Sequence, residues 1–315
     1  MIEHLLHSLR EVWHCLEIDH PFPEVPLTVL QRRRRLVMVV FDGKKQVGPL
    51  AVVKVNRFPA ENAQMERYVR CAQELRRRVD AGVQRTIPPM EILRPYLGCQ
   101  SVAEKAMPGR PFEISALRVR PNLVEAQCAR FADWLVKFHA ETSSDKIKIG
   151  NETIEVLEER LNGKTPAIHW KDHLQPLQGV ELPLVWVYGD AHPSNILYQD
   201  GEVSGLVDWE GTIGDQLPVY DWYQFCVSLL LENLKLELPQ QTLASRNAIA
   251  CQKMMTFQDG TLAAILKRRT CEFLRAIDLD FEIHHALFSL FLLDYYVCPD
   301  KHLVLQQVFA GGRDG

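Results

Sequence analysis

The stretch "VYGDAHPSNILYQDGEVSGLVDWEG", residues 187–211, restricts the fold more than any other part of the chain. The apolar run "PLVWVYG" that leads into it is typical of a strand and stops at Gly189. The next run, "NILYQDGEVSGLVDW", predicts a β-hairpin with its turn at Asp200 and Gly201, because an Asp-Gly pair between apolar residues favours a tight turn. A loop at a strand end is therefore followed directly by a hairpin.

This hairpin would gather several oxygen-bearing side chains. Asp190 begins the loop, Asn195 enters the first arm and Asp208 leaves the second. Because the turn lies midway between the arms, folding returns Asp208 to the neighbourhood of Asn195 and Asp190. Magnesium favours carboxylate and amide oxygens, and carboxylates that meet without a cation repel one another at neutral pH. We therefore predict a magnesium and polyphosphate site, with simple capping and turning of the chain as the alternative role of these residues.

The N-terminal third of the chain mixes helical and strand-like patterns. Residues 2–16 and 59–79 place apolar side chains at helical spacing, and two β-rich runs between them, "LVMVVF" and "LAVVKV", flank a turn. The later run "SVAEKAMPGRPF" is typical of a strand that ends in a Pro-Gly turn, so we expect a domain boundary near Met107. The second helix would bury Met65, Tyr68, Val69, Ala72 and Leu75.

The rest of the chain is mainly helical. The run "LVEAQCARFADWLVKFHAE" is strongly periodic, and a helical piece around 154–161 stands in an otherwise mixed and polar segment. We therefore predict an α+β protein, with residues 1–107 as a small β-rich lobe and residues 108–315 as a larger helical lobe. Further helical blocks are expected at 219–236, 241–256, 260–276 and 281–297.

Composition excludes several classes of protein. The net charge of −4, with acidic and basic residues interspersed, argues against nucleic acid as a partner. The apolar stretch "ALFSLFLLDYYV" is too short to cross a bilayer and Asp294 interrupts it, so no membrane span is expected. The N-terminus lacks the cationic leader of a signal peptide, which favours a cytoplasmic location. The sequence makes no prediction of the oligomeric state.

The segments "YGDAHPSN" and "DWE", with a hairpin between them, resemble the aminoglycoside phosphotransferase and choline kinase family, small-molecule relatives of the protein kinases. That family carries a pattern like HGDxHxxN, then a hairpin and a DxE or DxD. The resemblance implies a protein-kinase-like fold with two lobes. It also implies ATP- and magnesium-dependent transfer of the γ-phosphoryl group to a hydroxyl of a small molecule, such as a sugar, an aminoglycoside or an amino alcohol. GTP is the alternative donor.

The resemblance also implies roles for individual residues. Asp190 would accept or orient the substrate hydroxyl, while Asn195 and Asp208 would hold magnesium. Glu210 would assist at the metal. Such a site supplies the positioning and charge stabilisation on which phosphoryl transfer depends. Asp221 would brace the catalytic loop through backbone hydrogen bonds, or would be an ordinary acidic residue in the first turn of a helix.

Two further segments resemble the nucleotide-binding parts of the family. Lys54 in "AVVKV" corresponds to the strand lysine that grips the α and β phosphates. In "VAEKAMPGR", backbone groups near Lys105 and Met107 would meet the edge of a purine.

The glutamate that would pair with Lys54 is open between two positions in the same helix. Glu61 lies on the apolar stripe and Glu66 lies off it, while Tyr68 occupies the expected slot. The context "MERYV" favours Glu66.

The chain departs from the family pattern at three points. Tyr188 replaces the usual histidine, the partner of Lys54 is ambiguous, and no glycine-rich phosphate loop precedes the first hairpin. The arginines at 32–35 stand there instead, as a phosphate-binding patch or as a solvated strand edge. A noncatalytic nucleotide-binding scaffold of the same fold is therefore the alternative function. A metallohydrolase that uses "GDAH" is a third reading, but His192 lacks the additional histidines of such a site.

Overall fold

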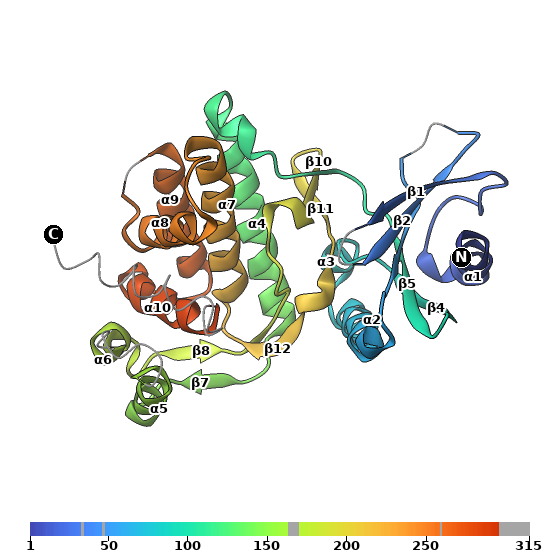
Figure 1. Cartoon of the computed structure of the whole chain (residues 1–315). Helices are drawn as coiled ribbons and strands as arrows, with labels where there is room; N and C mark the ends of the chain where they lie inside the picture. Colours follow the sequence, from blue (N-terminus) through green and yellow to red (C-terminus); the bar gives the residue numbers. More distant parts are fainter. Residues whose placement is uncertain (33–34, 46–47, 163–169, 259, 296–315) are drawn as a thin grey trace. The chain divides into compact units, whose positions relative to one another are not determined.

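The computed structural model describes residues 1–32, 35–45, 48–162, 170–258 and 260–295 and divides the chain into two compact units (Figure 1). Unit 1 contains Met1–Pro111, Tyr188–Asp190 and Asn195–Ile213. Unit 2 contains the other described residues. In the part of the chain that the structure describes, every helix is too short or too polar to cross a membrane.

The predicted boundary differs from the observed one in two ways. Unit 1 extends to Pro111 rather than Met107, and it also takes up the hairpin of residues 195–213. The difference arises because β6 (Arg110–Pro111) pairs with the first strand of that hairpin, at Tyr198 and Leu197. This pairing places the predicted catalytic segment and the predicted nucleotide-binding strand in the same unit.

A five-stranded antiparallel sheet forms the centre of unit 1, in the order β1-β2-β3-β5-β4. The predicted hairpin is confirmed, since β2 and β3 pair along their length. The alternation of β3 directs Val53 and Val55 to one face of the sheet and Lys54 to the other. The strands are β1 (Pro26–Arg32), β2 (Leu36–Asp42), β3 (Ala51–Val55), β4 (Met90–Tyr96) and β5 (Cys99–Lys105).

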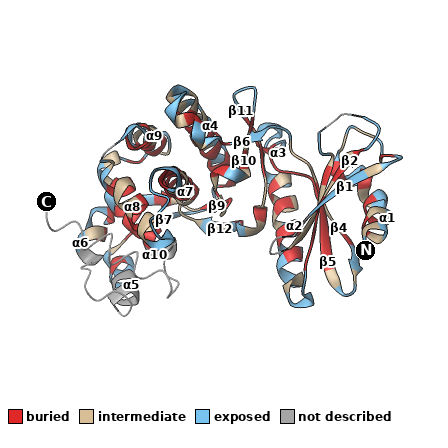
Figure 2. Cartoon of the chain, turned by 45° about the horizontal axis from the view of Figure 1, so that its top comes forward, coloured by how far each residue is buried: buried red, intermediate tan, exposed pale blue. Residues whose placement is uncertain are grey.

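Helices cover both faces of this sheet (Figure 2). The helix α1 (Ile2–Val12) continues into a 3-10 turn at Trp13–Leu16 and packs with Val53 and Val55 in one core. The helix α2 (Asn62–Arg78) packs against β4 and β5, and a short helix α3 (Ala81–Gln84) follows it. All five side chains that the periodicity assigned to the buried face of α2 are buried. The face of Lys54 is therefore the face that α2 covers.

The predicted second hairpin is also confirmed. It consists of β10 (Ile196–Gln199) and β11 (Glu202–Leu206), which pair antiparallel. Its turn residues Asp200 and Gly201 have φ of 53° and 84°. Two successive positive φ values are the geometry for which an Asp-Gly pair is suited.

Unit 2 is mainly helical, as predicted. Its long helix α4 packs against α9, and α7 packs against α8. Two short strand pairs accompany the helices. The strands β7 and β8 pair within the segment that the sequence marks as mixed and polar, and β9 pairs with β12, which follows the second hairpin. The helices are α4 (Pro121–Thr142), α5 (Asn151–Asn162), α6 (Trp170–Leu174), α7 (Tyr220–Glu237), α8 (Leu243–Thr256), α9 (Thr261–Ala276) and α10 (His284–Tyr295). The short strands are β7 (Lys146–Lys148), β8 (Glu181–Pro183), β9 (Val185–Val187) and β12 (Ile213–Gln216).

Two buried histidines in unit 2 differ in their hydrogen bonding. His284 lies 3.0 Å from the Tyr223 hydroxyl through Nδ1 and 3.1 Å from the Met254 carbonyl through Nε2. Since a carbonyl only accepts, Nε2 donates and Nδ1 accepts from the tyrosine. By contrast, neither ring nitrogen of His139 has a hydrogen-bond partner among the described residues. Burial lowers the pKa of His139 to about 3.

We predict that His139→Leu stabilises the protein by roughly 1 kcal/mol or more at pH 7, because it removes two unsatisfied buried polar atoms. The unfolded histidine titrates at its ordinary pKa of 6.5, whereas burial keeps the folded ring neutral down to about 3. The stability that depends on the neutral ring is therefore complete above pH 6.5 and is lost as pH falls below it. Urea unfolding at pH 7 and pH 5 measures both effects, since the variant should take up about one proton fewer on unfolding at pH 5.

The matched control is His284→Leu, which should destabilise the protein because it leaves the Tyr223 hydroxyl and the Met254 carbonyl without their bonds. Equal losses of stability in the two variants would contradict the distinction between these histidines.

Candidate active site

A network of four side chains, three of them buried, lies on the α2 face of the sheet in unit 1. The Lys54 Nζ is 2.8 Å from a Glu104 oxygen and 2.5 Å from an Asp208 oxygen. The Tyr68 hydroxyl donates to Glu104 at 2.8 Å and lies 3.5 Å from the Lys54 Nζ. Lys54 and Glu104 are only 7% and 3% exposed, so this ion pair is held away from water. The second hairpin brings Asp208 to it across 154 residues of sequence.

The electrostatics of the network follow from this arrangement. Burial by itself would lower the pKa of Lys54, but the negative charges of Glu104 and Asp208 outweigh it, and the net pKa is raised. Burial raises the pKa of the Tyr68 hydroxyl well above its ordinary value, and the charge of Glu104 raises it further. Lys54 therefore stays charged and Tyr68 stays neutral at physiological pH.

The predicted pairing of Lys54 with Glu66 is wrong. Glu66 is exposed, because it follows Met65 by one position and so lies off the buried stripe of α2. Among the described residues, the carboxylates in ion-pair distance of the Lys54 Nζ belong to Glu104 and Asp208. The helix supplies Tyr68 instead, and the strand β5 supplies the glutamate. Sequence reasoning missed Glu104, although a carboxylate inside the apolar run "SVAEK" was a signal for it.

The loop before the hairpin is held by backbone and side-chain hydrogen bonds. The Asn195 amide donates to the Asp190 carboxylate at 2.8 Å, and the Val207 N–H donates to the Asn195 carbonyl at 3.0 Å. The backbone at Asn195 and Val207 thus pairs next to both Asp190 and Asp208. The proximity expected from the hairpin, of Asp208 with Asn195 and Asp190, is realised at the level of the backbone.

Tyr188, which stands where the family carries a histidine, is fully buried and supports this loop. Its hydroxyl donates to the Val207 carbonyl, and its own carbonyl accepts from the Thr212 hydroxyl at 3.2 Å. The ring of Trp209 packs edge-on against it, with centroids 4.8 Å apart. Tyr188 therefore ties the strand end before Asp190 to the segment around Asp208.

The oxygen ligands that the sequence proposed for magnesium fit that ion by their chemistry. Asp208 has a left-handed backbone, with φ of 63°, and its side chain is 45% exposed. In the described residues, no three His, Cys, Asp or Glu side chains are arranged as a metal cage. Mg²⁺ does not need one, since it is usually bound by one or two protein oxygens together with phosphates and water. Asn195 and Asp208 carry the two protein oxygens that the sequence predicts for such a site.

Glu210 has a cationic partner of its own. It lies in a 3-10 turn (Trp209–Gly211) directly after Asp208 and forms an ion pair with Arg35, which precedes β2. The side chain of Arg35 is 11% exposed. Arg35 is therefore not a solvated strand edge, and its partner in this structure is the Glu210 carboxylate. Residues 33 and 34 of that run lie outside the described residues.

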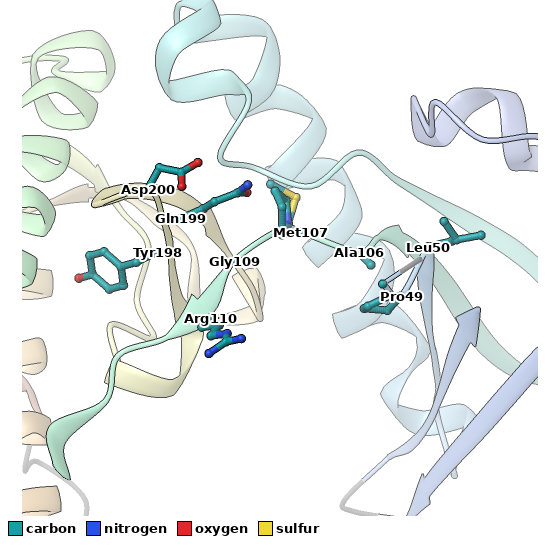
Figure 3. Close-up of a pocket in the computed structure, with 11 residues that line it drawn as sticks. Pro49, Leu50, Ala106, Met107, Gly109, Arg110, Tyr198, Gln199 and Asp200 are labelled. Atoms are coloured by element: carbon teal, nitrogen blue, oxygen red, sulfur yellow. The ribbon is translucent and has the colours of Figure 1, made fainter. Parts of the chain in front are cut away.

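A cavity of about 690 Å³ lies beside the predicted purine-binding segment (Figure 3). The cavity is lined by Leu50, directly before β3, by Met107, which follows β5, and by Tyr198 of the second hairpin, all within unit 1. Lys105 lines a neighbouring cavity of about 540 Å³, and its ammonium donates to the Glu17 carbonyl at 2.5 Å. A volume of about 690 Å³ is in the range that small ligands occupy.

Two further residues from the sequence analysis lie in unit 2. His192 contacts the Ser194 hydroxyl at 2.8 Å and Glu232 at 3.4 Å, so it has the orienting neighbours that the sequence did not reveal. Asp221 is fully buried near the start of α7. The neighbouring Gln224 accepts from the Ala191 N–H at 3.1 Å, so α7 holds the backbone that follows Asp190.

Gly189, directly before Asp190, cannot accept a side chain. Its φ is +80°, and an added Cβ would lie 2.1 Å from the Gly211 carbonyl oxygen. We predict that Gly189→Ala destabilises the protein by roughly 1–3 kcal/mol or more, from backbone strain together with the clash. It should also lower phosphotransfer activity through displacement of Asp190. Urea unfolding and a turnover assay measure the two effects. Gly150→Ala is the control, since an added Cβ there meets nothing within 4 Å.

Two solved structures share this fold over almost their whole length. Aminoglycoside 2'-phosphotransferase-IIIa in its GDP complex is 13% identical, with a TM-score of 0.53 over 98% of this chain and 99% of that one. A thermostable mutant of aminoglycoside phosphotransferase APH(4)-Ia, in a ternary complex with AMP-PNP and hygromycin B, is 9% identical, with a TM-score of 0.51 over 99% of each chain. No curated protein matches the sequence significantly.

The sequence profile described as "Phosphotransferase enzyme family" matches residues 39–232, which is more than half of the chain. The matched range contains Lys54, Asp190, Asn195 and Asp208. The chain therefore belongs to the phosphotransferase enzyme family and is a small-molecule kinase with a protein-kinase-like fold.

Proposed function

We propose that the protein transfers the γ-phosphoryl group of ATP to a hydroxyl of a small molecule in a magnesium-dependent reaction. The observation that supports this most directly is the ion pair of Lys54 with Asp208 at 2.5 Å. It joins a buried cation suited to phosphate oxygens and a half-exposed carboxylate suited to magnesium within one compact unit. Phosphoryl transfer needs these two groups side by side.

Each proposed role follows from the chemistry of the side chain. Lys54 neutralises phosphate oxygens, and Asn195 with Asp208 supplies oxygen ligands to magnesium. Asp190 accepts or orients the acceptor hydroxyl, held in place by the Asn195 amide at 2.8 Å. Bound magnesium would neutralise charge that develops on the phosphate oxygens. We assign the purine to the cavity beside Met107, where backbone groups of Lys105 and Met107 would meet its edge.

The acceptor is proposed as a class only. Hydroxyl-rich amines and sugars are the leading candidates, because the solved structures of similar fold are aminoglycoside phosphotransferases, one of them holding hygromycin B. GTP is the alternative donor, since one of these structures holds GDP. A nucleoside triphosphate donor must be present where the enzyme works, so we propose a cytoplasmic location.

The test is magnesium-dependent ATP consumption against a panel of aminoglycosides, sugars and amino alcohols, with mass spectrometry of the products. We expect at least one acceptor to stimulate ATP consumption and to gain one phosphoryl group. Calorimetry of ATP and GTP binding, with and without magnesium, accompanies it. Tight magnesium-dependent nucleotide binding without turnover on any acceptor would favour the noncatalytic scaffold instead.

A further inference from the structure

Arg35 brings a second cation to the site. It stands between β1 and β2, directly before Leu36, and its guanidinium forms an ion pair with Glu210. The side chains of Arg35 and Glu210 are 11% and 30% exposed, so the pair is shielded but not sealed from water. Both residues belong to unit 1. The pair therefore joins the N-terminal sheet to the turn that follows Asp208.

The ion pairs of Arg35 and Lys54 lie next to each other. Their carboxylates, Glu210 and Asp208, are two residues apart in the chain. The positive charge of Arg35 also reaches the Tyr68 hydroxyl, where it acts to lower the pKa that burial raises. Tyr68 in turn lies 3.5 Å from the Lys54 Nζ. Lys54 of β3 and Arg35, directly before β2, thus each pair with one of two neighbouring carboxylates after the hairpin.

The charges of these four side chains are complementary to those of the proposed ligands, a magnesium ion and a polyphosphate. In the free protein Lys54 and Arg35 act as counterions of Asp208 and Glu210. A magnesium ion competes with these cations for the carboxylates, and a polyphosphate offers the cations new anionic partners. A guanidinium is particularly suited to the exchange, because its planar fork of donors matches phosphate as well as carboxylate geometry.

We propose that Arg35 is a phosphate-binding residue, which exchanges Glu210 for the terminal phosphate of a bound nucleoside triphosphate when magnesium arrives. The inference rests on the proposed function, since it requires the site to bind a magnesium nucleotide. It assigns the binding of the terminal phosphate to the side chain of Arg35. The proposal also requires the protein to discriminate triphosphate from diphosphate, because a diphosphate lacks the terminal phosphate that is assigned to Arg35.

The exchange has opposite consequences for two variants. In Arg35→Gln the terminal phosphate loses a charge-assisted bidentate partner, so affinity for magnesium AMP-PNP should fall roughly tenfold or more. Affinity for magnesium ADP should change much less. In Glu210→Gln the guanidinium is released from its carboxylate, so metal-free AMP-PNP should bind several-fold more tightly than to the wild type. If the ion pair were purely structural, both variants would change nucleotide affinity in the same direction.

The experiment is isothermal titration calorimetry of AMP-PNP and ADP, each with magnesium and with EDTA, on both variants and the wild type. Arg94→Gln is the matched control, since Arg94 pairs with Glu11 on the surface, where the side chains are 65% and 37% exposed. It should change none of the affinities. Thermal unfolding of each variant shows whether any change in affinity accompanies a loss of folded protein.

Three outcomes bear on the proposal. Selective loss of triphosphate affinity in Arg35→Gln, together with tighter metal-free binding in Glu210→Gln, supports it. Unchanged discrimination between triphosphate and diphosphate in Arg35→Gln, with normal binding by the wild type, overturns this inference alone. Failure of the wild type to bind either nucleotide overturns the proposed function as well.

Discussion

An Asp190→Asn variant is expected to bind magnesium nucleotide with unchanged affinity and to lose about 10²- to 10⁴-fold in kcat. The Asp190 carboxylate accepts a hydrogen bond from the Asn195 amide at 2.8 Å, and an amide oxygen at position 190 can still accept it. The loop therefore keeps its shape. An amide cannot take up the proton of an acceptor hydroxyl, so the loss falls on the chemical step rather than on binding.

Steady-state kinetics on the acceptor found in the panel, with calorimetry of AMP-PNP binding, separates these two quantities. Asp133→Asn makes the same chemical change on the exposed face of α4, where the Asp133 side chain is 62% exposed, and should leave kcat unchanged. If Asp190→Asn kept more than a tenth of the wild-type kcat, Asp190 would be a loop-shaping residue rather than the group that handles the hydroxyl.

The parts of this site that the sequence predicted correctly are those that local chemistry determines. The turn of the second hairpin depends on Asp200 and Gly201 themselves, whose positive φ values suit that residue pair. The buried face of α2 follows from periodicity within one helix. From these local features alone, the return of Asp208 towards Asn195 could be predicted.

Two strands of the large sheet were missed because they lie at its edges. In β1, the apolar side chains of Leu27 and Val29 are 57% and 45% exposed. This strand therefore lacks the usual alternation of buried apolar and exposed polar side chains. In β4, Pro95 interrupts the pattern, since a proline argues against a central strand. The observed order β1-β2-β3-β5-β4 places both strands where such residues are tolerated. Strand order is a property of the whole sheet, which local patterns do not contain.

The error about the partner of Lys54 has the same origin. Lys54 opposes Val102 in β5, so Glu104, two positions further on, lies on the same face and diagonal to it. That relation is visible only once the register of β3 and β5 is known. The family resemblance predicts this glutamate in the helix α2. In the structure, Tyr68 occupies the position in α2 that faces Lys54, and Glu66 faces solvent. The glutamate that neutralises the lysine reaches it from a strand rather than from a helix.

The buried ion pair leads to the largest expected effect on stability. Lys54→Met should lower the free energy of unfolding by about 3–5 kcal/mol, because it leaves the Glu104 carboxylate buried without its cation. Asp208 adds little to this loss, since its side chain is 45% exposed and water can solvate it. Restoring neutrality should recover much of the loss. In the double variant Lys54→Met with Glu104→Gln, no buried charge remains, and the amide oxygen can still accept from the Tyr68 hydroxyl.

Urea unfolding of the wild type, the single variant and the double variant at pH 7 measures these differences. Lys44→Met is the matched control, because Lys44 pairs with Glu24 on the surface, where the side chains are 59% and 79% exposed. Its removal should cost less than about 1 kcal/mol. Neither variant of Lys54 should bind nucleotide phosphates as the wild type does, so recovered stability without recovered binding would separate the structural role of the pair from its role in the site. A double variant no more stable than the single one would show that the cost lies in packing around position 54 rather than in the uncompensated charge.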